Sequence, residues 1–477
     1  MPRYAAIDIG SNSLRLLVAD TTVGRPMQVL AAERLVTRLG ESVFRSGRIS
    51  KDAMTVVCQQ LARFAEIHKQ HEVLAVRAVA TSAVRDASNR QEFLQRASQA
   101  VGVPVEIISG QEEARLIHLG VQAVWPHPHQ RIMIIDVGGG SAEIILSESG
   151  RMEAAFSKPL GAVRLTEVFL KSDPPTAAEL HRLDQFIDEK MAKPLERIGK
   201  GPFDRMIATS ATAAAIVCAV NRIPRARREE ADRRRATVGQ LRTFYKEAAG
   251  RDLATRRKMQ GVGPRRAEII VGGTAVFLRA MEAFGQPSLS YAAAGVREGI
   301  VADLSARRVG RELSQLGRDQ RQSVAQLGKR CGVAPKHSKK VGDLAHELFL
   351  GLLPLHRLPP VWGKLLEASA YLHDIGHFIS DTAHHRHSYY IVQNADLAGF
   401  TDSEQHFIAL LCRYHRKTAP AAGQAGIEGL DAESLRALTL LTPLLRIADS
   451  LDRSQEQKIE HAVCEISDGS VDRKSNV

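Results

Sequence analysis

The chain has 477 residues, of which 65 are Lys or Arg and 53 are Asp or Glu, so its formal net charge is +12. With 44% apolar and 25% charged residues, the composition is that of a globular protein and excludes wholesale disorder and collagen-like repeats. No run reaches the ~18 apolar residues of a membrane span, and the start has no signal-peptide segment, so a cytoplasmic protein without a membrane partner is expected.

Residues 1–304 alternate short β-branched runs with longer amphipathic stretches. Helices are expected over Lys51–His68 and Glu112–Val124. Strands are expected over Arg3–Ile9, Leu14–Ala19, Val73–Ala80, Val103–Ser109, Arg131–Asp136, Ala142–Leu146 and Asp204–Ala208. This alternation predicts an α/β architecture built from layers.

From about Ser305 the pattern becomes helical almost throughout, which predicts a separate all-α domain. Within it, Thr442-Pro443 is interpreted as a helix N-cap followed by Pro at the first helical position. The predicted division is 1–125, 126–304, a linker over 305–323, an all-α domain over 324–467 and a disordered tail over 468–477.

Two similar loops stand at domain-sized spacing, Asp8-Ile-Gly-Ser-Asn-Ser13 and Asp136-Val-Gly-Gly-Gly-Ser141, each following a strand. Glycine permits close backbone approach, and successive N–H groups in such a turn can bind an anion. An aspartate at the strand end can hold Mg²⁺ through water. Either loop alone could be an ordinary glycine turn, but the matched pair predicts two related lobes facing a shared cleft.

Three strand-to-helix turns add further polar candidates. Ser82, Arg85 and Asn89 stand at i, i+3 and i+7, so they would share one face of a helix start, where anions bind favourably; a plain cap with a surface arginine is the alternative. Thr209 and Ser210 could contact phosphate or could serve only as caps. The acids at 112 and 113 fit ordinary helix-dipole chemistry or a base that activates water.

Taken in order, these motifs resemble the exopolyphosphatase and guanosine pentaphosphate phosphohydrolase (Ppx/GppA) family of the actin-like, sugar-kinase-like ATPase superfamily. The similar segments are DIGSNS at 8–13, ATSAVRDASN at 80–89, ISGQEEARLI at 108–117, DVGGGSAEI at 136–144, GVREGIVADL at 295–304, HHRHSYYIVQN at 384–394, RYHRK at 413–417 and LLRIADSLDRS at 444–454. The resemblance implies two ribonuclease-H-like lobes around a cleft, followed by an all-α HD-type domain, and a homodimer.

The resemblance also implies Mg²⁺-dependent hydrolysis of a terminal phosphoanhydride. Glu113 would position or deprotonate the attacking water, with Glu112 as the fallback, while Asp8 and Asp136 would lie near the metal. Phosphate would be held by residues of the loops and turns, namely Gly10, Ser11, Asn12, Ser13, Ser82, Arg85, Asn89, Gly138, Gly139, Gly140, Ser141, Thr209 and Ser210. The chain departs from the family where residues 208–212 replace a glycine-rich turn, which weakens the case for a nucleotide contact there.

Arginines gather in residues 221–235 and again in 251–266. They are either a solvated, salt-bridged helix face or a basic track that guides a polyanion. Nucleic acid is an unlikely partner on this pattern, because aromatic residues make up 5% of the chain and no base-stacking motif is evident.

The all-α region carries His337, His373-Asp374 and Asp449, in the order H…HD…D of HD phosphohydrolases. Other histidines in the region are His384, His385, His387 and His415. Imidazole and carboxylate ligands from separate helices suit one or two divalent transition metal ions, so His337, His373, Asp374 and Asp449 form a second candidate metal site. The HD pair is often degraded in relatives, where the domain is structural, but here it is intact.

Three functional hypotheses follow. The first is an exopolyphosphatase that removes terminal phosphates from inorganic polyphosphate, with guanosine pentaphosphate as the alternative substrate. The second is a polyphosphate or alarmone sensor with weak catalysis. The third places the main chemistry at the metal site of the all-α domain.

Overall fold

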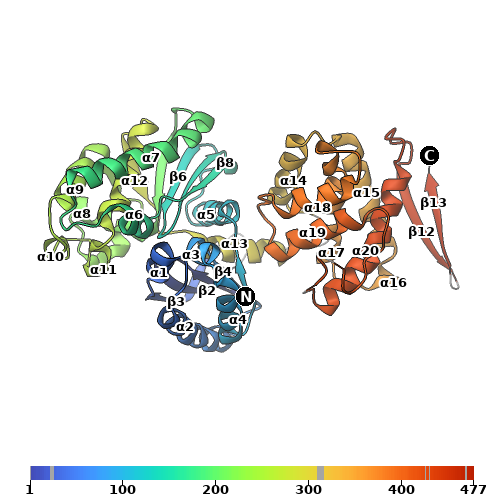
Figure 1. Cartoon of the computed structure of the whole chain (residues 1–477), viewed down its shortest axis with the longest axis horizontal. Coiled ribbons are helices and arrows are strands. Elements are labelled where there is room, and N and C mark those ends of the chain that lie inside the picture. Colours follow the sequence, from blue (N-terminus) through green and yellow to red (C-terminus); the bar gives the residue numbers. More distant parts are fainter. Residues whose placement is uncertain are drawn as a thin grey trace. The chain divides into compact units, whose positions relative to one another are not determined.

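The computed structural model describes residues 2–21, 26–308, 316–424, 426–428, 430–467 and 470–476. It consists of two compact units, Met1–Ala306 (unit 1) and Arg307–Val477 (unit 2) (Figure 1). Helix α13 (Val296–Arg308) and helix α14 (Arg318–Arg330) both extend into the predicted linker, and residues 309–315 of that linker lie outside the described residues. Among the described residues, no helix has the length and apolar character that crossing a membrane requires.

Unit 1 contains two sheets that repeat one design. The strands of the first, in the order β3-β2-β1-β4-β5, are β3 (Gln28–Val36), β2 (Ser13–Asp20), β1 (Arg3–Ile9), β4 (Ala75–Ala80) and β5 (Val105–Ile107). Those of the second, in the order β10-β11-β9-β6-β7-β8, are β10 (Arg235–Thr237), β11 (Ser288–Tyr291), β9 (Arg205–Thr209), β6 (Arg131–Val137), β7 (Ala142–Glu148) and β8 (Arg151–Lys158). Strand β1 pairs antiparallel with β2 and parallel with β4, and strand β6 pairs antiparallel with β7 and parallel with β9. This shared design confirms two related lobes.

The seven strands expected from the sequence are present, with ends that differ by up to two residues. Both faces of these sheets are covered, which explains why their strands read as nearly continuous apolar runs. On β1, Ile7 and Ile9 pack with α2 and α4, whereas Tyr4 and Ala6 face the opposite side. The helices of unit 1 up to residue 220 are α1 (Leu39–Ser46), α2 (Lys51–Gln70), α3 (Ser82–Asp86), α4 (Arg90–Val101), α5 (Gly110–Val124), α6 (Ala162–Phe169), α7 (Ala177–Ile198) and α8 (Ser210–Val220).

Helix α5 lies between the two sheets. Its Leu116 is buried with Tyr4 of β1 and Ile300 of α13, while Ala114, Ile117 and Val121 are buried with strands of the second lobe. The remaining helices of unit 1 are η1 (Arg225–Ala231), α9 (Val238–Ala249), α10 (Leu253–Arg256), α11 (Pro264–Ala267) and α12 (Ile270–Ala283). The acidic pair at 112–113, in the first turn of α5, is therefore held by both lobes.

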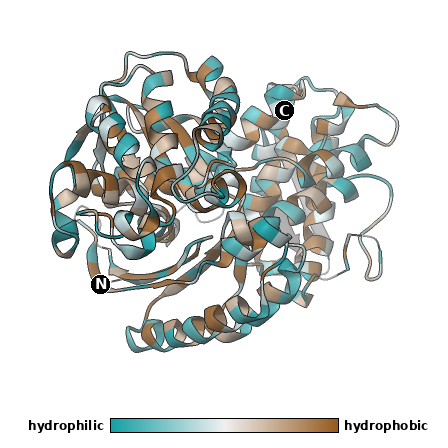
Figure 2. Ribbon diagram, turned by 60° about the vertical axis from the view of Figure 1, so that its left-hand side comes forward, coloured by the Kyte–Doolittle hydropathy of each residue, from teal (hydrophilic) through white to brown (hydrophobic). Residues whose placement is uncertain are grey.

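Unit 2 is helical around a single apolar core, apart from one hairpin. Its further elements are α15 (Pro335–Gly351), α16 (Leu353–His356), α17 (Val361–Leu372), η2 (Ile375–Phe378), α18 (His384–Gln393), α19 (Asp402–Tyr414), α20 (Ala432–Leu451), β12 (His461–Ser467) and β13 (Ser470–Asn476). Brown and teal residues alternate along many helices of the chain, as expected for helices with one buried face (Figure 2).

Two expectations for unit 2 were wrong. Helix α20 begins after the cap Asp431 and runs through Pro443, so Thr442-Pro443 does not start a helix. Strand β13 pairs antiparallel with β12, so residues 470–476 of the predicted disordered tail form half of a hairpin. The other tail residues, 468, 469 and 477, lie outside the described residues.

Candidate functional site

The two predicted phosphate loops are the turns of equivalent hairpins. Gly10 N donates to Ser13 O at 3.1 Å between β1 and β2, and Gly138 N donates to Ser141 O at 3.0 Å between β6 and β7. In both hairpins the aspartate lies two residues before the first glycine, at the end of a central strand. The structure thus gives the two loops the same local conformation.

These loops also contact one another, which explains the glycines of the second. A Cβ on Gly139 would lie 2.9 Å from Ser11 Cβ, and one on Gly140 would lie 2.5 Å from Ser82 Oγ. Such distances are too short for real side chains, so only glycine allows this approach. The contact brings Asp8 and Asp136 to one cleft.

The loops line a cavity of about 390 Å³, large enough for several phosphates. Predicted site residues that line it are Asp8, Gly10, Ser11, Asn12, Ser13, Glu113, Asp136, Gly138, Gly139, Gly140, Ser141 and Ser210. Most of the predicted catalytic and phosphate-binding residues therefore meet in one place.

Glu113 has the surroundings expected of a general base. Its helix, α5, is capped by Ser109, whose Oγ accepts a hydrogen bond from Glu112 N at 3.1 Å. Glu113 lies in the first turn of this helix and lines the cavity. Glu113 Oε2 is buried without a hydrogen-bond partner among the described residues, and Arg85 Nη1 lies 3.8 Å away. Burial, and then the negative charge of Glu143, raise the pKa of Glu113 well above its usual range.

Glu143 is a site residue that the sequence reasoning missed. It lies opposite Asp136 across the β6–β7 hairpin, is fully buried, and accepts a hydrogen bond from Ser157 Oγ at 2.8 Å. Burial and the nearby Asp136 raise the pKa of Glu143 to about 7. The hairpin register could have revealed it, because cross-strand partners share one face of a sheet.

Burial also raises the pKa values of Asp8 and Asp136. The charge of Asp8 further raises the pKa of Asp136, and both aspartates raise the pKa of Glu113. The carboxylate oxygens of Glu113 and Glu143 that lack a hydrogen-bond partner lie in this same group. Oxygen donors with this much mutual repulsion suit a hard divalent cation such as Mg²⁺. The residues present therefore fit the predicted metal.

Arginines form the other wall of the cavity. Arg15, Arg34 and Arg297, which the sequence reasoning missed, line it together with Arg228 and Arg266 of the basic segments. No carboxylate forms an ion pair with Arg34 or Arg266 among the residues that the structure describes. Burial and neighbouring arginines lower the pKa of each of these two guanidinium groups to about 9. This accumulation of uncompensated positive charge favours a polyanionic ligand.

A second cavity of about 190 Å³ continues this wall. It shares Arg34, Arg228 and Arg266 with the first and adds Arg225 and Arg265. The arginines of the basic segments therefore differ in their surroundings. Among the described residues, Arg227 forms an exposed ion pair with Glu230, whereas the arginines that line the cavities, Arg225, Arg228, Arg265 and Arg266, form no ion pair with a carboxylate.

Glu112 is not positioned as a fallback base. It is buried outside the cavity lining, where Arg115 Nε donates to its Oε2 at 2.7 Å and Arg77 donates to its Oε1 at 3.2 Å. Burial opposes ionisation, but these two guanidinium groups outweigh it and lower the pKa of Glu112. Asp303 of α13 bonds the same arginines, so the cluster fastens α5 to its neighbours.

Two residues of the ATSAVRDASN segment also differ from expectation. Helix α3 ends at Asp86, so Asn89 does not share a helical face with Ser82 and Arg85. The Asn89 amide instead bonds both backbone groups of Ile49, at 2.9 and 3.0 Å. Asn89 is therefore a structural residue. Ser82 Oγ accepts from Arg164 Nη2 at 3.2 Å at the edge of the loops, near Gly140.

The turn at 208–212 keeps a glycine-like backbone despite its sequence. Ser210 has φ = 86°, a region that glycine favours, and its Oγ accepts from the N–H groups of Thr212 and Ala213. Thr209 Oγ1 donates to Asp136 Oδ2 rather than facing the cavity. Thr209 therefore positions a carboxylate, and the Ser210 hydroxyl serves as a cap.

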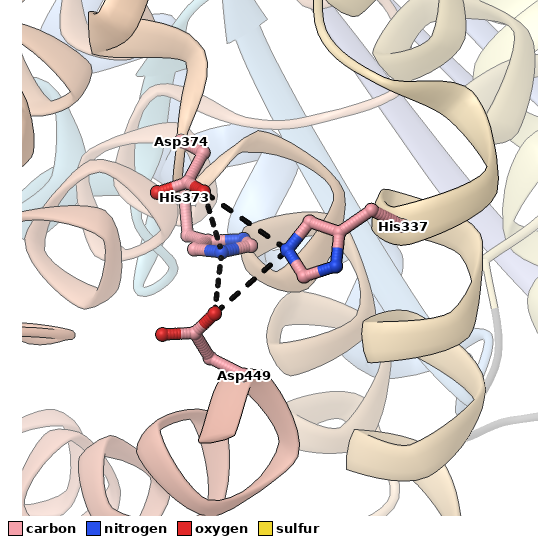
Figure 3. Close-up of side chains that lie close together, drawn as sticks. All are labelled: His337, His373, Asp374 and Asp449. Atoms are coloured by element: carbon pink, nitrogen blue, oxygen red, sulfur yellow. Dashed lines mark ion pairs between the residues drawn. The ribbon is translucent and has the colours of Figure 1, made fainter. Parts of the chain in front are cut away.

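The predicted metal ligands of unit 2 meet at helix ends, although they lie far apart in the sequence (Figure 3). His337 comes from the first turn of α15, His373-Asp374 follows α17, and Asp449 lies in the last turn of α20. The His373 Nε2 atom lies 3.4 Å from both Asp374 Oδ2 and Asp449 Oδ1, and the His337 Nε2 atom lies 4.0 and 3.8 Å from the same two atoms. The four residues could hold one metal ion.

The sequence profile of the Ppx/GppA phosphatase family matches residues 17–308, and that of its domain III matches residues 320–475. The chain belongs to the Ppx/GppA phosphatase family. It is 27% identical over 471 residues to a guanosine-5'-triphosphate,3'-diphosphate pyrophosphatase of Vibrio vulnificus, with 98% of this chain and 90% of the relative covered.

Solved structures agree with this membership. A Ppx/GppA family member from Aquifex aeolicus matches at 30% identity with a TM-score of 0.56, over 65% of this chain and 99% of that one. An exopolyphosphatase from Cytophaga hutchinsonii matches at 25% identity with a TM-score of 0.59, over 63% and 97%. The expected reaction class of this Ppx/GppA protein, phosphoanhydride hydrolysis, is confirmed by these relationships.

Proposed function

We propose that the chain is a Mg²⁺-dependent exopolyphosphatase that acts in the cleft of unit 1. The observation that carries this proposal is that the buried Glu113, whose Oε2 atom accepts no hydrogen bond within the described part of the chain, shares one cavity with Arg34 and Arg266, which form no ion pair with a described carboxylate. Hydrolysis of a phosphate chain requires a base and a site that binds several negative charges.

The terminal phosphate would lie between the two loops, where backbone N–H groups of residues 10–13 and 138–141 can donate to its oxygens. Glu113 would accept a proton from the attacking water. Asp8, Asp136 and Glu143 would hold Mg²⁺, which supplies neutralisation of the charge on the phosphate oxygens. Arg85, 3.8 Å from Glu113, would orient this base and the reacting phosphate.

Inorganic polyphosphate is favoured as the substrate because the arginine wall extends beyond the first cavity into a second one. A linear polyanion would use both, whereas a single terminal phosphoanhydride needs only the first. Guanosine pentaphosphate remains the alternative, in line with the name of the Vibrio vulnificus relative. At residues 208–212, where the sequence departs from the family's glycine-rich turn, Ser210 has a positive φ, as glycine would. The backbone of this turn is therefore no objection to a nucleotide.

The test is phosphate release with Mg²⁺ from long-chain polyphosphate and from guanosine pentaphosphate, measured side by side. Faster release from polyphosphate is expected. Release from the nucleotide alone would overturn the substrate assignment and leave the hydrolytic site in place. Binding of both without release would favour the sensor hypothesis.

For unit 2 we propose an HD-type domain that binds one divalent transition metal at His337, His373, Asp374 and Asp449. A mixed imidazole and carboxylate set suits such a metal. Metal analysis of the purified chain with Asp374→Ala as the comparison tests it. We also propose that the protein is a cytoplasmic homodimer. Sedimentation of the purified chain would test the oligomeric state.

A further inference from the structure

We infer that Arg164 of α6 is a positioning residue for the hydrolysis. It holds the loop at 138–141, called the second loop below, in the conformation that directs backbone N–H groups toward the terminal phosphate. This inference rests on the proposed function, in which the second loop binds that phosphate. Arg164 does not line the cavity, so it acts through the loop and not on the phosphate itself.

The three glycine carbonyl groups of the second loop all bond to α6. Gly138 O and Gly139 O accept hydrogen bonds from backbone N–H groups of residues 162–164, at distances of 2.9 to 3.0 Å. The carbonyl group of the third glycine bonds to a side chain instead: Gly140 O accepts a hydrogen bond from Arg164 Nε at 2.7 Å. The direction of this last carbonyl group therefore depends on one side chain.

The direction of these carbonyl groups also sets the direction of the N–H groups that follow them. In a trans peptide the C=O and N–H bonds point in opposite directions, so the N–H groups of Gly139, Gly140 and Ser141 point away from α6. None of the three donates to an acceptor among the residues that the structure describes, and all three residues line the cavity. Successive N–H groups of this kind form an anion site, and Arg164 fixes the third of them.

The guanidinium group of Arg164 is itself held by residues of the first lobe. Its Nη2 atom donates to Ser82 Oγ at 3.2 Å and forms an ion pair with Asp86, and both partners belong to α3. Its Cζ atom lies 4.1 Å from the ring centroid of Phe44, in α1. Because Asp86 neutralises its charge, Arg164 contributes direction rather than net positive charge to the phosphate site.

The first loop, at 10–13, is held from behind in a similar way but without such a side chain. Asn12 O accepts hydrogen bonds from the N–H groups of Thr37 and Arg38, just before α1, at 3.2 and 3.3 Å. Within the described part of the chain, no side chain donates to a carbonyl oxygen of this loop. The dependence on a side chain is therefore particular to the second loop, and substitution of Arg164 should affect that loop alone.

The test measures equilibrium binding of radiolabelled inorganic phosphate, with Mg²⁺, to the full chain and its variants. Arg164→Met removes the donor to the loop, and loss of one oriented hydrogen bond to a charged group predicts about 10-fold weaker phosphate binding. Arg45→Met is the matched control, because Arg45 forms an ion pair with Glu167 between α1 and α6 but bonds to neither loop. Its phosphate affinity should equal that of the wild type.

Asp86→Asn separates the direction of the loop from its charge. If Arg164 orients the loop, loss of its charged anchor should weaken phosphate binding, although less than Arg164→Met does. If the charge of Arg164 attracted phosphate directly, the same substitution would free that charge and tighten binding, and this result would overturn the inference. The Asp86 side chain is 40% exposed, so the variant should fold, which thermal unfolding checks.

Turnover supplies a second readout that a merely structural role would not give. Arg164→Met should lower kcat by up to ~10²-fold, as loss of a donor to the reacting phosphate does, with little change in the KM for polyphosphate, because the arginine wall binds the rest of the chain. A raised KM with unchanged kcat would contradict the positioning role.

Failure of this inference and failure of the proposed function give different results. Equal phosphate affinity of the wild type and Arg164→Met would overturn the inference and leave the proposed function standing. Release of phosphate from guanosine pentaphosphate alone would overturn the proposed substrate, while a lower kcat of Arg164→Met with that nucleotide would still support the inference. No phosphate binding by the wild type would remove the loop as a phosphate site, and the inference with it.

Discussion

The cleft of unit 1 and the histidine cluster of unit 2 both gather buried polar groups, but they are prepared for different ligands. In the cleft, carboxylates with raised pKa values share a cavity with Arg34 and Arg266, which form no ion pair with a described carboxylate, so the cleft suits a phosphate ligand together with a hard cation. In unit 2, His337 and His373 each have Nδ1 beside an oxygen atom and Nε2 near the Asp374 carboxylate. This arrangement suits a transition metal ion without a phosphate ligand.

The difference teaches how each part must be tested. A site that waits for a polyanion should lose catalysis or affinity when one of its charges is removed. At a site that suits a metal ion, removal of one ligand should abolish metal binding before it affects anything else. The two adjacent glutamates of α5 give the sharpest contrast within the cleft itself, since only one of them faces the cavity.

The largest effect is expected for Glu113→Gln. Removing the proton acceptor should lower kcat for phosphate release by ~10²–10⁴-fold, whereas polyphosphate binding is retained. Phosphate release at saturating substrate, together with a direct binding assay, measures both quantities. A variant with unchanged release would show that another group is the base.

Glu112→Gln should act on stability rather than on chemistry. It removes one carboxylate from the buried cluster and leaves Asp303 to compensate both Arg77 and Arg115; breaking a buried ion pair in this way costs ~3–5 kcal/mol. Denaturant unfolding measures the loss, and kcat at a temperature where the variant is folded should stay near that of the wild type. A fall in kcat as large as that of Glu113→Gln would contradict the assignment.

Arg266→Met should weaken the hold on the substrate. Loss of a charged hydrogen bond of ~1.5–3 kcal/mol predicts a KM for polyphosphate about 10- to 100-fold higher, with a smaller change in kcat. Arg242→Met is the matched control, because Arg242 forms an exposed ion pair with Glu282. Equal effects of the two substitutions would mean that general surface charge, rather than the arginine wall, binds the chain.

Glu143→Gln should lower kcat/KM at every pH, because Glu143 is a proposed Mg²⁺ ligand, and the smallest of the expected effects is the additional change in its pH dependence. The proposed base, Glu113, would act in its ionised form, so activity should fall as the pH drops through its pKa, which the charge of Glu143 raises. Removing that charge lowers the pKa of Glu113, so the acidic limb of the kcat/KM profile should move to lower pH. Glu148→Gln, on the same strand but exposed, should leave the limb where it is. A limb that moves to higher pH would contradict this coupling.

By itself, the sequence determined the local elements and the twin loops. Strand β1 was predicted at its observed ends, because alternating contacts on two covered faces leave an unbroken apolar run. The loops at 8–13 and 136–141 were recognisable because a strand, an aspartate and a glycine turn follow one another directly in the chain. The proposed metal ligands His337, His373, Asp374 and Asp449 were found through their order, which resembles that of HD phosphohydrolases, and through the ends of apolar helices.

Only the tertiary structure decided which of two neighbouring glutamates faces the cavity. Glu112 and Glu113 have the same side chain and helical turn, but the packing of α5 between two sheets turns one toward three buried charges and the other into the cavity. Arg34 and Glu143 were hidden for the same reason. Their significance lies in what faces them across space, and contacts between distant segments leave no periodic trace in a single chain.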